Sequence, residues 1–195
     1  ASKTGGNLTY VDANDILIGT VDGVNDITVT GTVSLTATAG AINDAADDAT
    51  TDLTAVGLIT LTAQDEIGGG IATKVTDTAG ALEVAAGSDL DVSSAAAGNI
   101  VLSGAGALTL SDVDTVDGAI TVTAAGALAA LLVDTADAGN DATHAVSLTT
   151  SSGDVTIGAI TSDGALSVVS AGSINDATDD ATTDLTAVGL ITLTA

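Results

Sequence analysis

The chain has 195 residues, of which 26 are acidic and only two, Lys3 and Lys74, are basic, so its formal net charge is −24. So few basic residues exclude a nucleic-acid-binding surface and a polybasic membrane-binding patch. Hydrophobic residues make up 46%, but Tyr10 is the only aromatic residue and cysteine is absent, which excludes disulfides, thiolate sites and a core built on aromatic rings.

Short runs that alternate apolar residues with Thr, Ser, Asp or Glu recur along the chain. In a strand, successive side chains point to opposite faces, so each run predicts a strand of about four residues with an apolar inner face. Gly, Asp, Asn or Ser ends most of the runs, as expected for turns. The expected strands are 27–30, 33–36, 59–62, 82–85, 90–93, 100–103, 108–111, 120–123, 146–149, 166–169 and 191–194.

The spacing of these runs predicts a coiled, all-β architecture. Comparable runs begin at residues 59, 82, 100, 120, 146, 166 and 191, so they are 18 to 26 residues apart. A Gly-Ala-apolar triplet precedes several of them, and we expect each glycine to mark a corner of the chain. We therefore predict a right-handed parallel β-helix of roughly 18–26 residues per coil, which runs through residues 1–195 as one continuous body without a linker.

One long segment of the chain occurs twice. Residues 39–63 recur 132 positions later as residues 171–195, and the two copies differ only at Ala41/Ser173 and Ala46/Thr178. Such a repeat indicates a modular unit that stacks on its neighbours. We expect the second copy to present the same acidic loop about six coils further along.

The Gly-x-(Ile/Leu)-x-(Leu/Val) rhythm and the phrases AGAIND and AGSIND resemble the β-helical shafts of large bacterial surface proteins. These include the filamentous-haemagglutinin-like adhesins and the giant β-strand-repeat proteins. The resemblance covers most of the chain and implies a secreted, cell-surface, structural or adhesive role. It carries no binding motif over to a position of this sequence.

Clustered aspartates are the main candidates for a binding site. The acidic loop of the repeat contains Asp44, Asp47, Asp48 and Asp52 in the first copy and Asp176, Asp179, Asp180 and Asp184 in the second. Carboxylate oxygens are the ligands that calcium prefers, so Ca²⁺ is the possible cofactor. The alternative is that these aspartates only form and solvate turns.

Two further interpretations concern single features. His144 is the only histidine and lies in a polar stretch, so we expect no enzyme activity. Outward threonine pairs such as Thr121 and Thr123 could form a flat ladder that binds ice. Such a surface needs regular rungs, and the irregular coil lengths argue against it.

These observations predict a structural segment of an extracellular, self-stacking bacterial surface filament or adhesin shaft. Exposed coil ends favour end-to-end association into a homopolymer, because a head-to-tail contact need not close. No nucleic acid and no membrane insertion are expected, and no adhesion target is identified. The alternative is a surface-layer or adhesin module that binds a partner through its acidic loops with the help of calcium.

Overall fold

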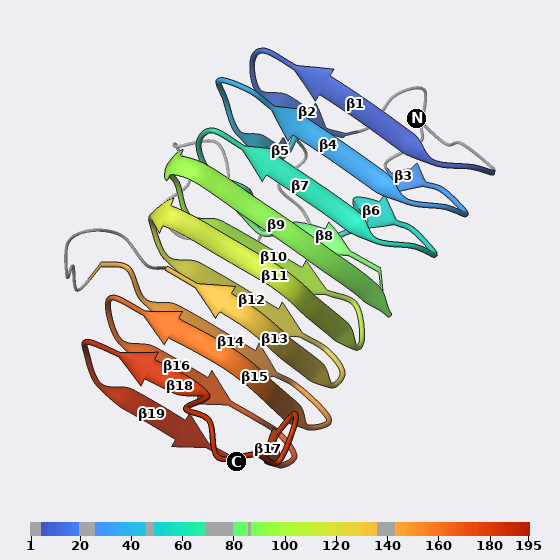
Figure 1. The fold of residues 1–195 in the computed structure, drawn as a ribbon. Coiled ribbons are helices and arrows are strands. Elements are labelled where there is room, and N and C mark those ends of the chain that lie inside the picture. The colour runs from blue at the N-terminus through green and yellow to red at the C-terminus, as the bar shows by residue number, and fades with distance from the viewer. Residues whose placement is uncertain (1–4, 20–25, 46–48, 69–79, 86, 136–142) are drawn as a thin grey trace.

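The chain folds as a stack of parallel β-coils that follow one another along a single axis (Figure 1). The computed structural model describes residues 5–19, 26–45, 49–68, 80–85, 87–135 and 143–195. Every strand pairing among these residues is parallel, and they contain no α-helix. The two ends of the described chain lie at opposite ends of the stack. The predicted all-β, parallel β-helical class is therefore confirmed.

Two long sheets run along the stack. Sheet A contains β1 (Leu8–Asp12), β4 (Val33–Ala37), β7 (Ile59–Ala63), β9 (Ser88–Ala97), β11 (Leu108–Asp117), β13 (Leu128–Asp134), β15 (Val155–Ser162), β17 (Ile174–Asp176) and β18 (Leu185–Ala187). Sheet B contains β3 (Ile27–Thr28), β6 (Leu53–Thr54), β8 (Leu82–Val84), β10 (Ile100–Gly104), β12 (Ile120–Ala124), β14 (Val146–Thr150), β16 (Leu166–Val169) and β19 (Ile191–Thr194). Strand β2 (Ile16–Ile18) pairs with β5 (Ile42–Asp44), and bridges through Ile67 continue this pair to β10. Each coil thus contributes to both sheets.

The core is a set of stacked aliphatic columns between the sheets. In β12, for example, Ile120, Val122 and Ala124 are fully buried, whereas Thr121 and Thr123 face outward. Parallel pairing in register places the inward residues of one coil on those of the next. A core one or two aliphatic side chains thick explains why the chain folds without aromatic rings in its interior.

Coil lengths lie within one residue of the predicted range of 18–26, with the exception of one long coil. In-register neighbours are 20 residues apart from Leu90 to Leu110, and 27 apart from Ala130 to Ile157. Ile59, however, pairs with Leu90, 31 residues later, and this long coil contains residues 69–79, which lie outside the described part. The expected 59-to-82 interval was wrong as a coil, because β7 belongs to sheet A and β8 to sheet B.

Glycine and Asx residues form the corners between the sheets. The side-chain oxygen of Asp15 accepts a hydrogen bond from the backbone N–H of Ala41 at 3.0 Å, one coil further on. Asn99 accepts one from Ala119 at 2.9 Å in the same way. Next to these donors, a Cβ on Gly40 or Gly118 would meet atoms of the previous coil. Close coil-to-coil approach therefore accounts for the Gly-Ala-apolar triplets.

The two copies of the 25-residue repeat occupy opposite halves of a coil. In the first copy, Ile42 stacks on Ile67 in the column that continues sheet B, and β7 lies in sheet A. In the second copy the order is reversed, because β17 pairs with β15 in sheet A and β19 pairs with β16 in sheet B. Five coils separate Ile42 from Leu166, and the chain then crosses to sheet A before Ile174. The repeat period is therefore five and a half coils, and not six.

Candidate metal centre

Three buried carboxylates meet where β5, the start of β6 and β8 lie side by side. Asp44 ends β5, Asp52 directly precedes β6, and Glu83 is the central residue of β8. One oxygen atom from each lies within 4.8 Å of the others, and the residues are only 3%, 2% and 7% exposed. Of the described residues, these are the three whose carboxylates come together closely enough to hold one metal ion.

The strands fix these side chains through their backbones. The N–H of Asp52 donates to the carbonyl of Glu83 at 2.9 Å, and the N–H of Glu83 donates to Asp52 Oδ2 at 3.1 Å. Leu82 and Val84, on either side of Glu83, point into the core and are fully buried. Strand alternation therefore directs Glu83 away from the core and towards the two aspartates.

Three ionised carboxylates this close together would repel one another, and protonation or a nearby cation would relieve the repulsion. Like charges a few ångströms apart repel strongly when protein rather than water surrounds them. A divalent cation bound by three hard oxygen ligands would relieve this repulsion. The cationic side chains of the chain itself are Lys3 and Lys74, both outside the described residues. The cluster could thus hold a metal in principle, with calcium the ion that suits its donors.

The second copy of the repeat places its aspartates differently. Asp176 and Asp184 border a shallow hollow of about 150 Å³ at the C-terminal end of the stack, together with Leu185 and Leu193. Asp180 accepts hydrogen bonds from the hydroxyl of Thr182 at 2.5 Å, from the backbone N–H of Thr182 at 2.6 Å and from the hydroxyl of Thr178 at 3.0 Å, and these bonds lower the pKa of its carboxyl. Asp179 is exposed and has a left-handed backbone with φ 47°. These four residues form the rim of a hollow and an Asp-stabilised turn.

The predicted metal ligands therefore separate into three groups. Asp44 and Asp52 come together with Glu83, whereas Asp47 and Asp48 lie outside the described residues. The four aspartates of the second copy lie at the other end of the chain. The sequence did not predict Glu83 as a member of this cluster, because it lies beside Asp52 only through a coil of 31 residues. No sequence motif marks the length of that coil. The one signal of Glu83 is that it is one of only two glutamates, the other being Glu66.

A second acidic feature crosses the outer face of sheet A. Asp91 pairs with Asp112 across β9 and β11, and Asp114 pairs with Asp134 across β11 and β13. Burial raises the pKa of Asp91, and the nearby charges of Asp112 and Asp89 raise it further. Burial is also the main cause of the raised pKa of Asp114, to which Asp112, Asp134 and Asp91 add while a hydrogen bond from Ser93 opposes it. The folded protein therefore disfavours ionisation of these two carboxyls.

This disfavoured ionisation predicts a gain in stability when Asp91 is replaced by Asn. A carboxyl group whose pKa is raised in the folded state contributes stability while it is protonated. This stability is fully present below about pH 3.9, the pKa of Asp in the unfolded chain, and is lost as the pH rises through the pKa in the folded state. At pH 7 we expect Asp91→Asn to raise the free energy of unfolding by about 0.2–1 kcal/mol, the range for like charges on paired strands. The gain should vanish as the pH is lowered to about 4. Thermal melts of both proteins at pH 4 and pH 7 measure this difference.

The matched control for that experiment is Asp12. The backbone N–H of Asn14 and the hydroxyl of Tyr10 both donate to this exposed carboxylate, and they lower its pKa. The ionised Asp12 carboxylate contributes stability at pH 7, which is the opposite of the effect at Asp91. This stability is lost as the pH falls through the folded-state pKa of Asp12. Asp12→Asn should therefore lower stability at pH 7. Equal shifts of the same sign in both variants would contradict the electrostatic explanation.

His144 ties two neighbouring coils together. Its Nε2 lies 2.7 Å from Asp117 Oδ1 in the preceding coil, and its carbonyl accepts the hydroxyls of Thr135 and Ser162. The imidazole is buried, whereas Asp117 is more than half exposed. His144 stands at the corner that leads into sheet B, where neighbouring coils carry Gly118 and Gly164. Its visible contacts are those of a structural link between coils.

Comparisons with known proteins give no family for this chain. No family model, no curated protein and no solved structure matches it. Among the described residues, no helix is long and apolar enough to cross a membrane.

Proposed function

We propose that this chain is a structural segment of an extracellular, self-stacking bacterial surface filament or adhesin shaft. The observation that carries the proposal is the open edge at each end of the described stack. At one end β1 pairs only with β4, and at the other β19 pairs only with β16. Unpaired parallel edges can accept another strand of the same direction.

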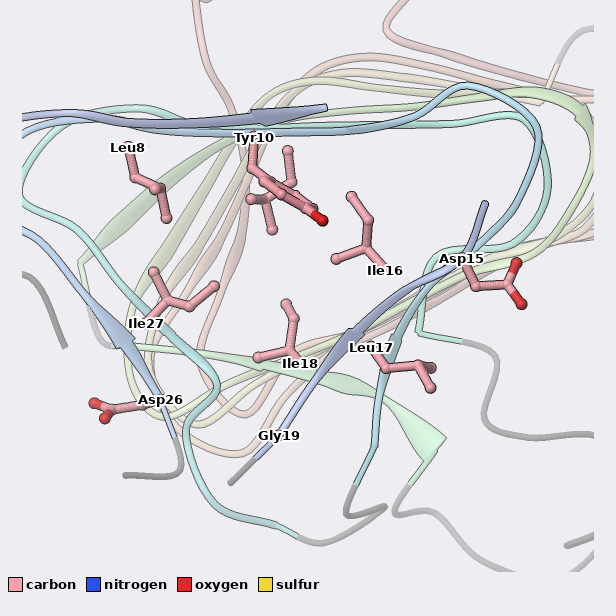
Figure 2. Close-up of a pocket in the computed structure, with 10 residues that line it drawn as sticks. Leu8, Tyr10, Asp15, Ile16, Leu17, Ile18, Gly19, Asp26 and Ile27 are labelled. Atoms are coloured by element: carbon pink, nitrogen blue, oxygen red, sulfur yellow. The ribbon is translucent and has the colours of Figure 1, made fainter. Parts of the chain in front are cut away.

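The N-terminal end also has an apolar hollow that a further coil could fill. It has a volume of about 460 Å³ and lies over Leu35 of the next coil. Figure 2 shows Leu8, Tyr10, Ile16, Ile18 and Ile27 directed towards this hollow. At the C-terminal end, Leu193 of β19 is 49% exposed although it belongs to an inward column. An end-to-end contact between two copies would bury both apolar ends and extend both sheets.

The resemblance to bacterial surface shafts and the composition support an extracellular location. A chain with two lysines, no arginine and one aromatic residue offers few sites to trypsin and chymotrypsin. The coil-to-coil backbone bonds and the aliphatic columns supply the mechanical role, and no catalytic step forms part of it.

Electron microscopy of the purified chain tests this function, and Leu193→Lys is the informative variant. The wild-type protein should form fibres whose width is that of one stack, and their number should rise with concentration. A lysine at position 193 would place a charge in the contact between copies, so fibres should be lost. Val56→Lys is the matched control, because Val56 is 82% exposed on the side of the stack and should leave the fibres intact.

Three results would contradict end-to-end stacking. Wild-type protein that stays monomeric at every concentration tested by sedimentation would end the proposal. Fibres that persist in Leu193→Lys would place the contact elsewhere. Two-dimensional lattices in place of fibres would favour the alternative function, a surface-layer module.

The buried carboxylate cluster favours a calcium-dependent form of that alternative. Asp44, Asp52 and Glu83 would hold the ion between two coils, so binding would stabilise the fold near the acidic loop. At a hundredfold excess over the dissociation constant, a ligand that binds only the folded state contributes about 2.7 kcal/mol. We therefore expect millimolar Ca²⁺ to raise the melting temperature over that in EDTA at equal ionic strength.

Substitution of Glu83 tests whether the cluster is the calcium site. Glu83→Gln should abolish most of the calcium effect, whereas Glu66→Gln, which changes the other glutamate, should preserve it. Lys74→Gln tests the other possible source of positive charge, a lysine side chain in place of the calcium ion. If calcium has no effect on the wild-type protein while Lys74→Gln destabilises it, the calcium proposal is wrong.

A further inference from the structure

The outer face of sheet B carries a regular array of hydroxyl groups. Five consecutive strands, β10, β12, β14, β16 and β19, each direct two side chains outward, which gives two files along the stack. One file is Val101, Thr121, Ser147, Ser167 and Thr192, and the other is Ser103, Thr123, Thr149, Val169 and Thr194. We call these ten residues the hydroxyl face. Eight of them are Thr or Ser, and the remaining two are Val, which has the shape of Thr.

The rungs of this face are regular although the coils differ in length. The four pairings that join the five strands contain no register shift, whereas β9 and β11 of sheet A are joined with two. Extra residues fall elsewhere, in the segment between β13 and β14 and in the loop between β17 and β18. The irregular coil lengths, which argue against a threonine ladder on sequence grounds, therefore leave these five strands of sheet B in register.

The hydroxyl face is uncharged in a chain with a net charge of −24. None of its eight hydroxyls donates a hydrogen bond to another described group, in contrast to Ser93 and Ser111 on sheet A, which donate to Asp114 and Asp89. Thr121, Thr123, Thr192 and Thr194 are exposed. Ser103, Ser147, Thr149 and Ser167 are half-buried, and Glu83 follows Ser103 in register at the end of the array.

The spacing of the array is two-dimensional and fixed. Neighbouring strands are about 4.8 Å apart, and residues i and i+2 of one strand are about 6.6 Å apart. The five threonines of the face are β-branched and have stiff χ1 angles, so their hydroxyl and methyl groups keep their places. Hydroxyl groups at such regular repeats can each hold a water molecule at a fixed position.

The energetics favour ordered water over a protein partner. A second protein laid on this face would have to satisfy eight hydroxyls or bury them at a cost of about 1–3 kcal/mol each. A lattice of water gives every hydroxyl a partner, and water-mediated hydrogen bonds are nearly as favourable as direct ones. A sugar surface would lack aromatic rings on which to stack, since the only one, Tyr10, is at the N-terminal end of sheet A.

We propose that the hydroxyl face is an ice-binding surface. The aligned Thr and Ser side chains hold water in an ice-like arrangement and attach the stack to an ice crystal. This activity is independent of end-to-end stacking, because the face lies on the side of the stack. Stacking copies would lengthen the face.

Thermal hysteresis and ice-crystal shape, measured on the full chain, test the proposal. The wild-type protein should open a gap between the melting and freezing points and produce faceted crystals. Thr121→Lys combined with Thr123→Lys should remove most of the gap, because two charged side chains then interrupt the central rung. The control is Thr109→Lys on the outer face of sheet A, which should retain the full gap.

Circular dichroism melts of each variant establish that the folds are equal. No hysteresis in the folded wild-type protein overturns the proposal, as does an undiminished gap in the double variant. Side-by-side dimers that the double variant abolishes, seen without hysteresis, also overturn it and assign the face to a second copy of the chain.

Discussion

Gly118→Ala should lower the free energy of unfolding by about 3 kcal/mol, the upper end of the cost of overpacking a filled interior. Gly118 stands at the corner before β12, directly over the corner of the preceding coil. A Cβ there would lie 2.6 Å from the carbonyl carbon of Gly98 and closer still to its oxygen. Both are backbone atoms, so relief requires the two coils to separate. Urea unfolding followed by circular dichroism measures the loss.

Gly57→Ala is the graded control for this corner effect. The Cβ would meet the Cγ2 of Thr32 at 2.9 Å and the carbonyl oxygen of Gly31 at 3.3 Å. The nearest atom belongs to a side chain that can rotate, so the loss should be clearly smaller. Equal losses in the two variants would mean that glycine's backbone freedom, and not the contact between coils, determines the cost.

Ile120→Ala should cost about 2–5 kcal/mol, the range for large-to-small substitution in a packed core. Ile120 is fully buried and stacks between Ile100 and Val146 in one inward column of sheet B. The core has no aromatic residue that could move into the cavity, so the vacated space should persist. Unfolding in urea gives the magnitude, and hydrogen exchange should show the loosened amides at β10, β12 and β14.

Ile191 provides the control within the same column. It occupies the last position, is 39% exposed, and has a described neighbour on one side only, Leu166. Ile191→Ala should cost less than about 1 kcal/mol, because little apolar surface is lost from the interior. A loss as large as that of Ile120→Ala would show that β19 is buried in solution, as an assembled fibre would make it.

Much of the fold could be predicted because alternation is a local property. All eleven expected runs lie within or overlap observed strands, from the run at 27–30 in β3 to the run at 191–194 in β19. Several of the missed strands carry weaker patterns. Strand β13 contains Ala129, Ala130 and two outward leucines, so the alternation is hidden, and β6 has only two residues.

The relation between coils could not be predicted because both halves of a coil have the same chemistry. A Gly-x-apolar corner leads into sheet A at Gly172 and into sheet B at Gly40, with nothing in the local sequence to distinguish them. For the same reason, Glu83 could not be predicted as a neighbour of Asp52. Their contact depends on which coil and which sheet each residue belongs to. Side-chain alternation is encoded within four residues. Whether a strand falls in sheet A or in sheet B depends instead on the length of every loop before it.

The half-coil offset between the repeat copies is the central claim about this architecture, and chemical cross-linking tests it directly. The chain has no cysteine, so a pair of introduced thiols reports one distance without background. Val169 and Thr194 are paired on the outer face of sheet B, whereas Thr161 lies in sheet A, paired with Thr186. If the last strand of the second copy lay in sheet A, as the last strand of the first copy does, Thr194 would take the position of Thr62. It would then stack in the column of Thr161. A short bifunctional thiol reagent should therefore join Val169→Cys to Thr194→Cys and fail to join Thr161→Cys to Thr194→Cys, and the reverse result would contradict the account.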